Sequence, residues 1–227
     1  MTKDYLQQSF FFFRSNFSAL LSIQLPFLII LMIIQMSTIS GVDESSNMQA
    51  QLILLTGMDM LFVPIYLAAT IFYMQAVIDG GSITTTQSWF MALRCWGRLF
   101  LTFVLSALVT ALGLMLLIAP GIYIAVRLAL ANAICVIEGK GPIDSMKESW
   151  EGTEGLFWTM FKGLALIFGG LFTLEVILSP MVDPSSMISM LISVTLDFLN
   201  VLGTIYAYRV YRAWRDREPV EDEPSVL

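Results

Sequence analysis

Long apolar stretches separated by short polar connections dominate this chain. A helix that crosses the hydrocarbon core of a bilayer needs about 20 mostly apolar residues. Six stretches meet or approach that length: residues 17–39, 51–78, 99–119, 121–137, 156–178 and 187–208. The pattern therefore predicts an all-α fold, a polytopic helical membrane protein with six transmembrane helices.

Two prolines mark expected irregularities in these helices. Pro64 lies inside the second stretch and predicts a kink there. Pro120 and Gly121 separate the third stretch from the fourth, and we expect the helix to break at this dipeptide. The first stretch is longer than the apolar region of a signal peptide, and no A-x-A cleavage site follows it. We therefore interpret it as a retained membrane span.

A short amphipathic segment precedes the first, third and fifth spans. These segments are residues 5–17, 86–98 and 142–154. In the second segment, Trp89, Leu93 and Trp96 recur at helical spacing and form one apolar face. Thr84 and Gln87 have the spacing of a capping box at its start. Aromatic residues beside basic ones are typical of helices in the headgroup layer, so we expect three cytoplasmic interfacial helices.

The order of amphipathic helix, span and span occurs three times. It fits three helical-hairpin repeats, at about residues 1–80, 81–140 and 141–212, although any protein with an even number of spans gives a similar pattern. We expect one membrane domain over residues 1–213. Residues 214–227 are acidic and contain proline, which predicts a disordered cytoplasmic tail.

The basic residues alternate between the two sides of this six-span arrangement. Lysine and arginine are enriched in cytoplasmic connections. Ten of the twelve fall before span one, after span six, or in the connections that follow spans two and four: Lys3, Arg14, Arg94, Arg98, Lys140, Lys147, Arg209, Arg212, Arg215 and Arg217. We therefore expect both termini in the cytoplasm, and Cys95 and Cys135 as reduced thiols on that side.

Composition removes several function classes. The chain is 57% hydrophobic and 13% charged, and it contains no histidine. Serine–histidine and cysteine–histidine catalysis and imidazole metal sites are thereby excluded. The two cysteines make no zinc motif, so we expect no metal or cofactor. A net charge of −6 does not fit nucleic-acid binding.

Ionisable side chains inside the spans are the strongest functional signal, because they are costly in a bilayer. Asp59, Arg127, Glu175 and Asp197 lie in four different spans, with Asn132 and Asn200 at similar depth. Counting at 1.5 Å per residue from the outer ends places the four ionisable groups about 5–15 Å deep, in the outer half of the membrane. We call these six residues the candidate polar cluster.

Two interpretations of this cluster remain open. In the favoured, structural one, Asp59 and Arg127 form an ion pair and Asp197 is hydrogen-bonded to Asn132 or Thr195. In the functional one, an excess of acidic groups surrounds a polar cavity for protons, a cation or a cationic headgroup.

One stretch of the chain carries a family resemblance. It combines a Pro-Gly break at Pro120, a span with Arg127, an E-G-x-G-P turn from Glu138 to Pro142, and an S-W pair at Ser149 and Trp150. This pattern resembles the YciC family of bacterial inner-membrane proteins. It is also similar to the membrane domain beside the catalytic domain of some glycerophosphodiester phosphodiesterases. The resemblance implies a bacterial cytoplasmic membrane and no catalytic residues, since a phosphodiesterase barrel needs histidine and about 250 further residues.

Three function classes follow. The leading hypothesis is a non-enzymatic integral inner-membrane protein in envelope or membrane maintenance, with membrane lipids, other inner-membrane proteins or further copies of itself as partners. The alternative is a small carrier or channel for protons, cations or an amphiphile that uses the candidate polar cluster. An intramembrane enzyme is disfavoured, because no nucleophile–base pair is evident.

Overall fold

The computed structural model describes residues 2–40, 48–183 and 186–217 of the 227-residue chain, without the side chains of residues 35–40, 48–55 and 59. The predicted tail at 218–227 lies outside the described residues. Within the described ranges the chain forms helices joined by turns: α1 Thr2–Ser15, α2 Phe17–Ser40, α3 Met48–Ile78, α4 Thr85–Leu116, α5 Ile118–Arg127, α6 Ala131–Glu138, α7 Pro142–Gly152, α8 Phe157–Leu178, a 3-10 turn Ser179–Met181, α9 Met187–Leu199 and α10 Val201–Arg215.

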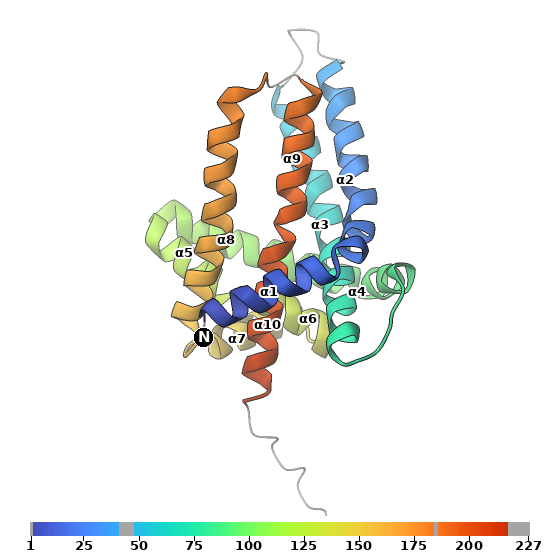
Figure 1. The fold of residues 1–227 in the computed structure, drawn as a ribbon. Coiled ribbons are helices and arrows are strands. Elements are labelled where there is room, and N and C mark those ends of the chain that lie inside the picture. Colours follow the sequence, from blue (N-terminus) through green and yellow to red (C-terminus); the bar gives the residue numbers. More distant parts are fainter. Residues whose placement is uncertain (1, 41–47, 184–185, 218–227) are drawn as a thin grey trace, which may run out of the picture.

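Six segments among the described residues are long and apolar enough to cross a membrane, which confirms the predicted number. They are Phe17–Ile34, Thr56–Ile78, Thr85–Leu116, Ile118–Glu138, Phe157–Met181 and Met187–Arg215. The fourth and sixth are each built from two helices, which meet at residues 128–130 and at Asn200. In Figure 1, α2, α3, α8 and α9 stand side by side, and α1 lies across them.

The first and third predicted interfacial helices exist as separate helices, α1 and α7. The second does not, because residues 86–98 continue directly into the third span as the single helix α4. The predicted capping box at its start is confirmed, with Thr84 and Gln87 bonded to each other's backbone.

The buried face of the α4 segment is not the predicted one, because Ser88, Ala92 and Cys95 are buried, whereas Leu93 is 55% exposed. The two tryptophans of the predicted face nevertheless bond to neighbouring helices. The indole nitrogen of Trp89 donates to the carbonyl of Ile23 at 3.2 Å, and that of Trp96 to the carbonyl of Leu61 at 3.1 Å. Each carbonyl lies three residues before a proline inside its own helix, Pro26 in α2 and Pro64 in α3. A proline has no N–H for the carbonyl four residues before it, so each indole binds next to a carbonyl that lacks its usual helical donor.

The helix break between the third and fourth spans lies at Leu117, three residues before the predicted position. Leu117 has extended backbone angles and separates α4 from α5. Pro120 then falls in the first turn of α5, where its missing N–H is tolerated. The two helices form a tight hairpin, because a Cβ atom on Gly113 would lie 3.0 Å from the Cα of Gly121.

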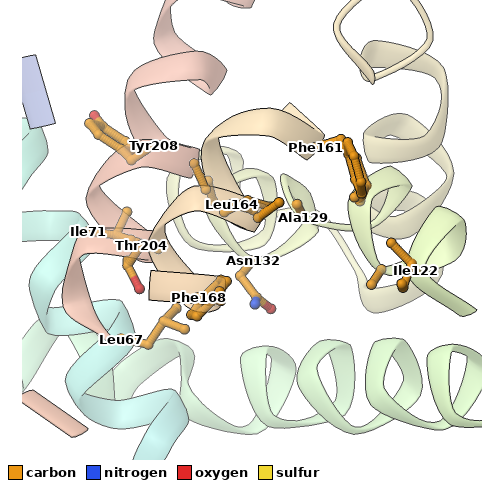
Figure 2. Close-up of a pocket in the computed structure, with 17 residues that line it drawn as sticks. Leu67, Ile71, Ile122, Ala129, Asn132, Phe161, Leu164, Phe168, Thr204 and Tyr208 are labelled. Carbon is orange, nitrogen blue, oxygen red and sulfur yellow. The ribbon is translucent and has the colours of Figure 1, made fainter. Parts of the chain in front are cut away.

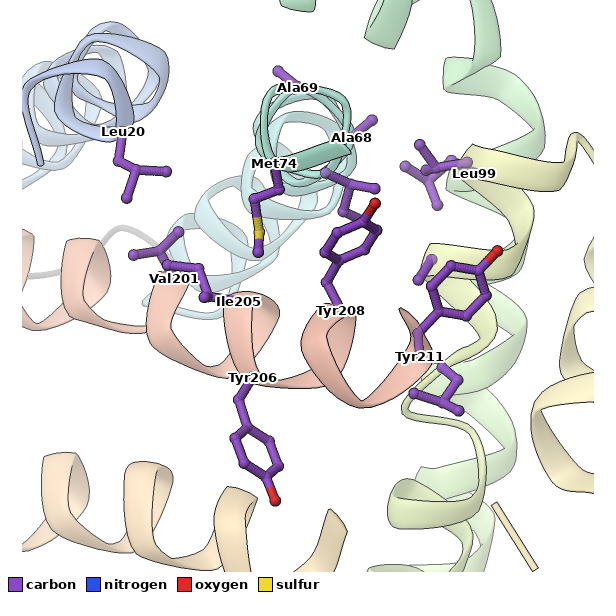
Figure 3. Packing of buried hydrophobic residues seen from close by; sticks show 14 of the residues in the cluster. Leu20, Ala68, Ala69, Met74, Leu99, Val201, Ile205, Tyr206, Tyr208 and Tyr211 are labelled. Carbon is purple, nitrogen blue, oxygen red and sulfur yellow. The ribbon is translucent and has the colours of Figure 1, made fainter. Parts of the chain in front are cut away.

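The core is organised around α10, which packs against α1, α3, α8 and α6. Val201, Ile205 and Tyr208 extend toward α3, whereas Tyr206 points in the opposite direction, to α8 (Figure 3). All four of these side chains are buried. In the same view α4 runs crosswise to α10, so the α4–α5 hairpin does not stand parallel to the other spans as a plain hairpin repeat would require.

Candidate functional site

A cavity of about 650 Å³ lies among α3, α5, α6, α8 and α10 (Figure 2). Its volume is within the range of roughly 300–1,000 Å³ that small-molecule sites occupy. We call it the central cavity. It is lined by Leu67, Ile71, Ile122, Ala125, Val126, Ala129, Asn132, Ala133, Phe161, Leu164, Ala165, Phe168, Gly169, Gly203, Thr204, Ala207 and Tyr208.

Small side chains create the space. Ala125 of α5, Ala129 of the turn between α5 and α6, and Ala133 of α6 all line the cavity. Gly169 of α8 leaves open space where a Cβ atom would be, with no other atom within 4 Å. The sequence did not predict this cavity, because its walls come from several elements that only tertiary packing brings together.

The central cavity opens at the side of the molecule between α5 and α8. Ile122 on α5 and Phe168 on α8 both line it, and they are 41% and 45% exposed. In a membrane such a surface faces lipid chains. The opening is therefore bordered by exposed apolar side chains.

Asn132 is the most polar group in the wall. Its side chain projects beside Phe168 in Figure 2. The carbonyl oxygen of this amide is buried, and no other described group donates a hydrogen bond to it. Buried polar atoms without partners are rare in native proteins, so this oxygen fits a donor supplied by a bound molecule. The wall offers no nucleophile–base pair, and among the described residues no cluster of metal ligands occurs.

The structure brings three members of the candidate polar cluster together. Glu175 of α8 lines a second cavity of about 230 Å³ with Asp197 and Asn200 of the α9 segment. Phe168 belongs to the walls of both cavities. We call this second cavity the acidic cavity. It is adjacent to the central cavity, whose wall includes Asn132.

Arg127 lies apart from these acidic groups. Its side chain is 6% exposed and packs against α7, with the guanidinium carbon 4.8 Å from the ring centre of Trp150 and 5.7 Å from that of Tyr123. Aromatic faces stabilise a cation in this position. The expected partner, Asp59, belongs to α3, but its side chain is outside the described part of the structure, so the predicted ion pair is untested. Thr195 donates to the carbonyl of Leu191 in its own helix.

The end of α5 is joined to α7 through the backbone of Arg127. Its carbonyl accepts hydrogen bonds from the hydroxyls of Ser149 at 2.8 Å and Thr153 at 3.1 Å. The Ser149 oxygen also accepts from the backbone N–H of Leu130 at 3.1 Å. These bonds satisfy polar groups that the break between α5 and α6 leaves without helical partners. The serine of the S-W pair is therefore a structural residue.

The E-G-x-G-P turn also has a clear structural role. Gly139 ends α6 with a positive φ of 70°, a conformation that glycine adopts without strain. Gly141 and Pro142 begin α7, with the proline in its first turn. The carboxylate of Glu138 accepts from the Tyr211 hydroxyl at 2.7 Å and from the Arg215 Nε at 2.8 Å, which ties this turn to α10.

Lys140 and Glu148 complete this charged network at the end of α10. The Lys140 ammonium lies 2.8 Å from Glu138 and also contacts Glu148, which in turn binds Arg215. Partial burial opposes the charge of Lys140, but the hydrogen bonds that its ammonium donates to Glu138 and Glu148 outweigh this effect and raise the pKa of Lys140 above its ordinary value. The network cross-links α6, α7 and α10.

Comparison with known proteins places this fold in a family. The model of the uncharacterised protein family UPF0259 matches residues 50–213. A UPF0259 membrane protein of Sodalis glossinidius is 31% identical over 132 residues, which cover 52% of this chain and 48% of the relative. One of Photorhabdus laumondii is 28% identical over 144 residues, which cover 60% and 54%.

The chain thus spans about half the length of these curated relatives. No solved structure matches it. The family match includes the central cavity, the acidic cavity and the E-G-x-G-P turn, and both relatives are membrane proteins. The chain belongs to the UPF0259 family of membrane proteins.

Proposed function

We propose that this protein acts in membrane maintenance by holding a lipid acyl chain in the central cavity, without catalysing a reaction. The observation that carries the proposal is the cavity itself, which is almost wholly apolar and opens sideways between α5 and α8. Asn132 supplies one polar contact for a hydroxyl or N–H group of the bound molecule. A hydrocarbon chain is the most abundant apolar ligand that a membrane offers to such an opening.

The proposed setting is the bacterial cytoplasmic membrane, with both termini in the cytoplasm. Its support is the alternation of lysine and arginine between connections. The charged network at Glu138 and Arg215 and the amphipathic helix α7 then lie at the cytoplasmic face, where such groups are hydrated.

Filling the central cavity tests the proposal. Gly169→Leu introduces a side chain into open space, so the protein should fold while its cavity is occupied. A phosphatidylethanolamine with a diazirine in one acyl chain, incorporated in nanodiscs, should label α5, α6 and α8 at lining residues such as Asn132 and Phe161. We expect this labelling, located by mass spectrometry, to fall to background in Gly169→Leu.

Gly170→Leu is the matched control, because Gly170 also has open space around it but does not line the central cavity. Labelling of the cavity residues should persist in this variant. Equal labelling in wild type and Gly169→Leu would contradict the proposal.

A second candidate function is a carrier for a cation or a cationic amphiphile. It is favoured by the acidic cavity, in which Glu175 and Asp197 lie next to the central cavity and share its Phe168 wall. Carboxylates at membrane depth commonly mark ion pathways.

Asp197→Asn distinguishes the two functions. A carrier should show pH-dependent cation flux in proteoliposomes that the variant abolishes while its thermal stability stays near that of wild type. If wild-type proteoliposomes give no flux above empty liposomes, the carrier function is rejected.

A further inference from the structure

A second groove, of about 630 Å³, lies between α1 and α8, on a different side of α8 from the central cavity. One wall is an apolar stretch of α8 that extends over about two helical turns. Within it, Leu166, Gly170 and Leu174 recur at every fourth position. Eight residues of helix extend about 12 Å, which suits the length of part of an acyl chain. We call this the α1–α8 groove.

The opposite wall is one face of α1. Gln7, Phe10, Phe11 and Arg14 recur at helical spacing and all line the groove. Phe10 and Phe11 are 61% and 72% exposed, so none of the described segments covers this face. The other face of α1 is already used, because Phe13 packs 5.6 Å from Phe198 of α9.

The charge on this groove has one sign. Arg14 is its only charged lining residue, since the other described lining residues are apolar, amide or hydroxyl groups. A second cation lies on α10 behind α1, where the Arg209 guanidinium carbon is 5.6 Å from the Phe12 ring centre. The acidic residue of α1, Asp4, is almost three helical turns from Arg14.

We propose that the α1–α8 groove binds one anionic phospholipid. Its acyl chain lies along Leu166, Gly170 and Leu174, and its phosphate lies on the Arg14 guanidinium, whose planar fork matches phosphate oxygens. Phe10 and Phe11 contact the chain below the headgroup, as aromatic rings do at membrane interfaces. α1 lies across the standing helices, the orientation of a helix in the headgroup layer (Figure 1). This site is independent of the central cavity.

Native mass spectrometry of the full chain in detergent, with phosphatidylglycerol or phosphatidylcholine of identical acyl chains added, tests the proposal. Wild type should bind one phosphatidylglycerol about tenfold more tightly than phosphatidylcholine, a difference of about 1.4 kcal/mol. Arg14→Gln should abolish this preference. Gly170→Leu should also abolish this preference, because the new side chain fills the groove, whereas a lipid in the central cavity should still bind.

Gly169→Leu is the control, since it fills the central cavity and leaves the α1–α8 groove open. It should retain the preference for phosphatidylglycerol, so loss of lipid from the groove can be distinguished from loss of lipid from the central cavity. Equal binding of both lipids by wild type would overturn the proposal. A preference for phosphatidylglycerol that survives Arg14→Gln or Gly170→Leu would overturn it as well. Unchanged melting temperatures of the variants would exclude misfolding as the cause of any loss.

Discussion

Gly163→Ala should destabilise the protein by about 2–3 kcal/mol, although it adds a single methyl group. A Cβ atom at this position would lie 2.0 Å from Cζ and 2.4 Å from Cε1 of Tyr206. The tyrosine cannot simply move aside, because it is fully buried and its hydroxyl donates to the carbonyl of Thr159 at 2.6 Å. The alanine therefore separates α8 from α10 or breaks this hydrogen bond.

The opposite effect on stability is expected for an alanine at Gly170, seven residues further along the same helix. No atom lies within 4 Å of a Cβ atom there. Gly170→Ala should be neutral or stabilising by up to about 1 kcal/mol, because alanine favours helix more than glycine does. Reversible unfolding in mixed micelles, followed by tryptophan fluorescence, measures both variants.

A double-mutant cycle identifies the cause. In a Tyr206→Ala background the Gly163→Ala substitution should cost much less, because the ring that it displaces is absent. If the two effects simply add, the close approach of Gly163 to Tyr206 is not what stabilises the α8–α10 contact.

The sequence was sufficient to predict the spans but not how they are arranged. Hydropathy depends on composition over about 20 residues, so six segments could be counted correctly. The α4 segment was misread because its face of Trp89 and Trp96 is equally suited to a membrane surface or to a protein surface. The actual partners of the two indoles are carbonyls of α2 and α3 three residues before a proline, and no local pattern predicts such contacts.

The difference between local composition and tertiary packing also explains where the residues of the candidate polar cluster lie. Glu175 and Asp197 were counted at different depths, about 5 Å and about 15 Å, yet both line the acidic cavity. Arg127 precedes an irregular turn at residues 128–130, which brings it to Trp150 of α7. Counting residues along a straight helix does not anticipate such a turn. The central cavity depends on residues from five elements, and their meeting is set by tertiary packing alone.

Glu138→Gln should destabilise the protein by about 2 kcal/mol, because hydrogen bonds to charged groups contribute about 1.5–3 kcal/mol each when a partner is removed. The Glu138 side chain is only 18% exposed, and Tyr211, Arg215 and Lys140 all contact its carboxylate. With a neutral amide at position 138, the half-buried Arg215 loses one of the two carboxylates that it contacts and keeps that of Glu148. The loosened part should be the end of α10, so trypsin should cleave at Arg215 faster than in wild type.

Asp79→Asn is the matched control for this network. Asp79, directly after α3, pairs with Arg212 of α10 at 2.9 Å, but the Asp79 side chain is 45% exposed. An exposed pair contributes only about 0–1 kcal/mol, because water and salt screen it. Trypsin cleavage and unfolding in Asp79→Asn should therefore stay close to wild type. If Glu138→Gln costs no more than Asp79→Asn, the E-G-x-G-P turn does not anchor α10, and its glutamate is available for a role other than holding the fold.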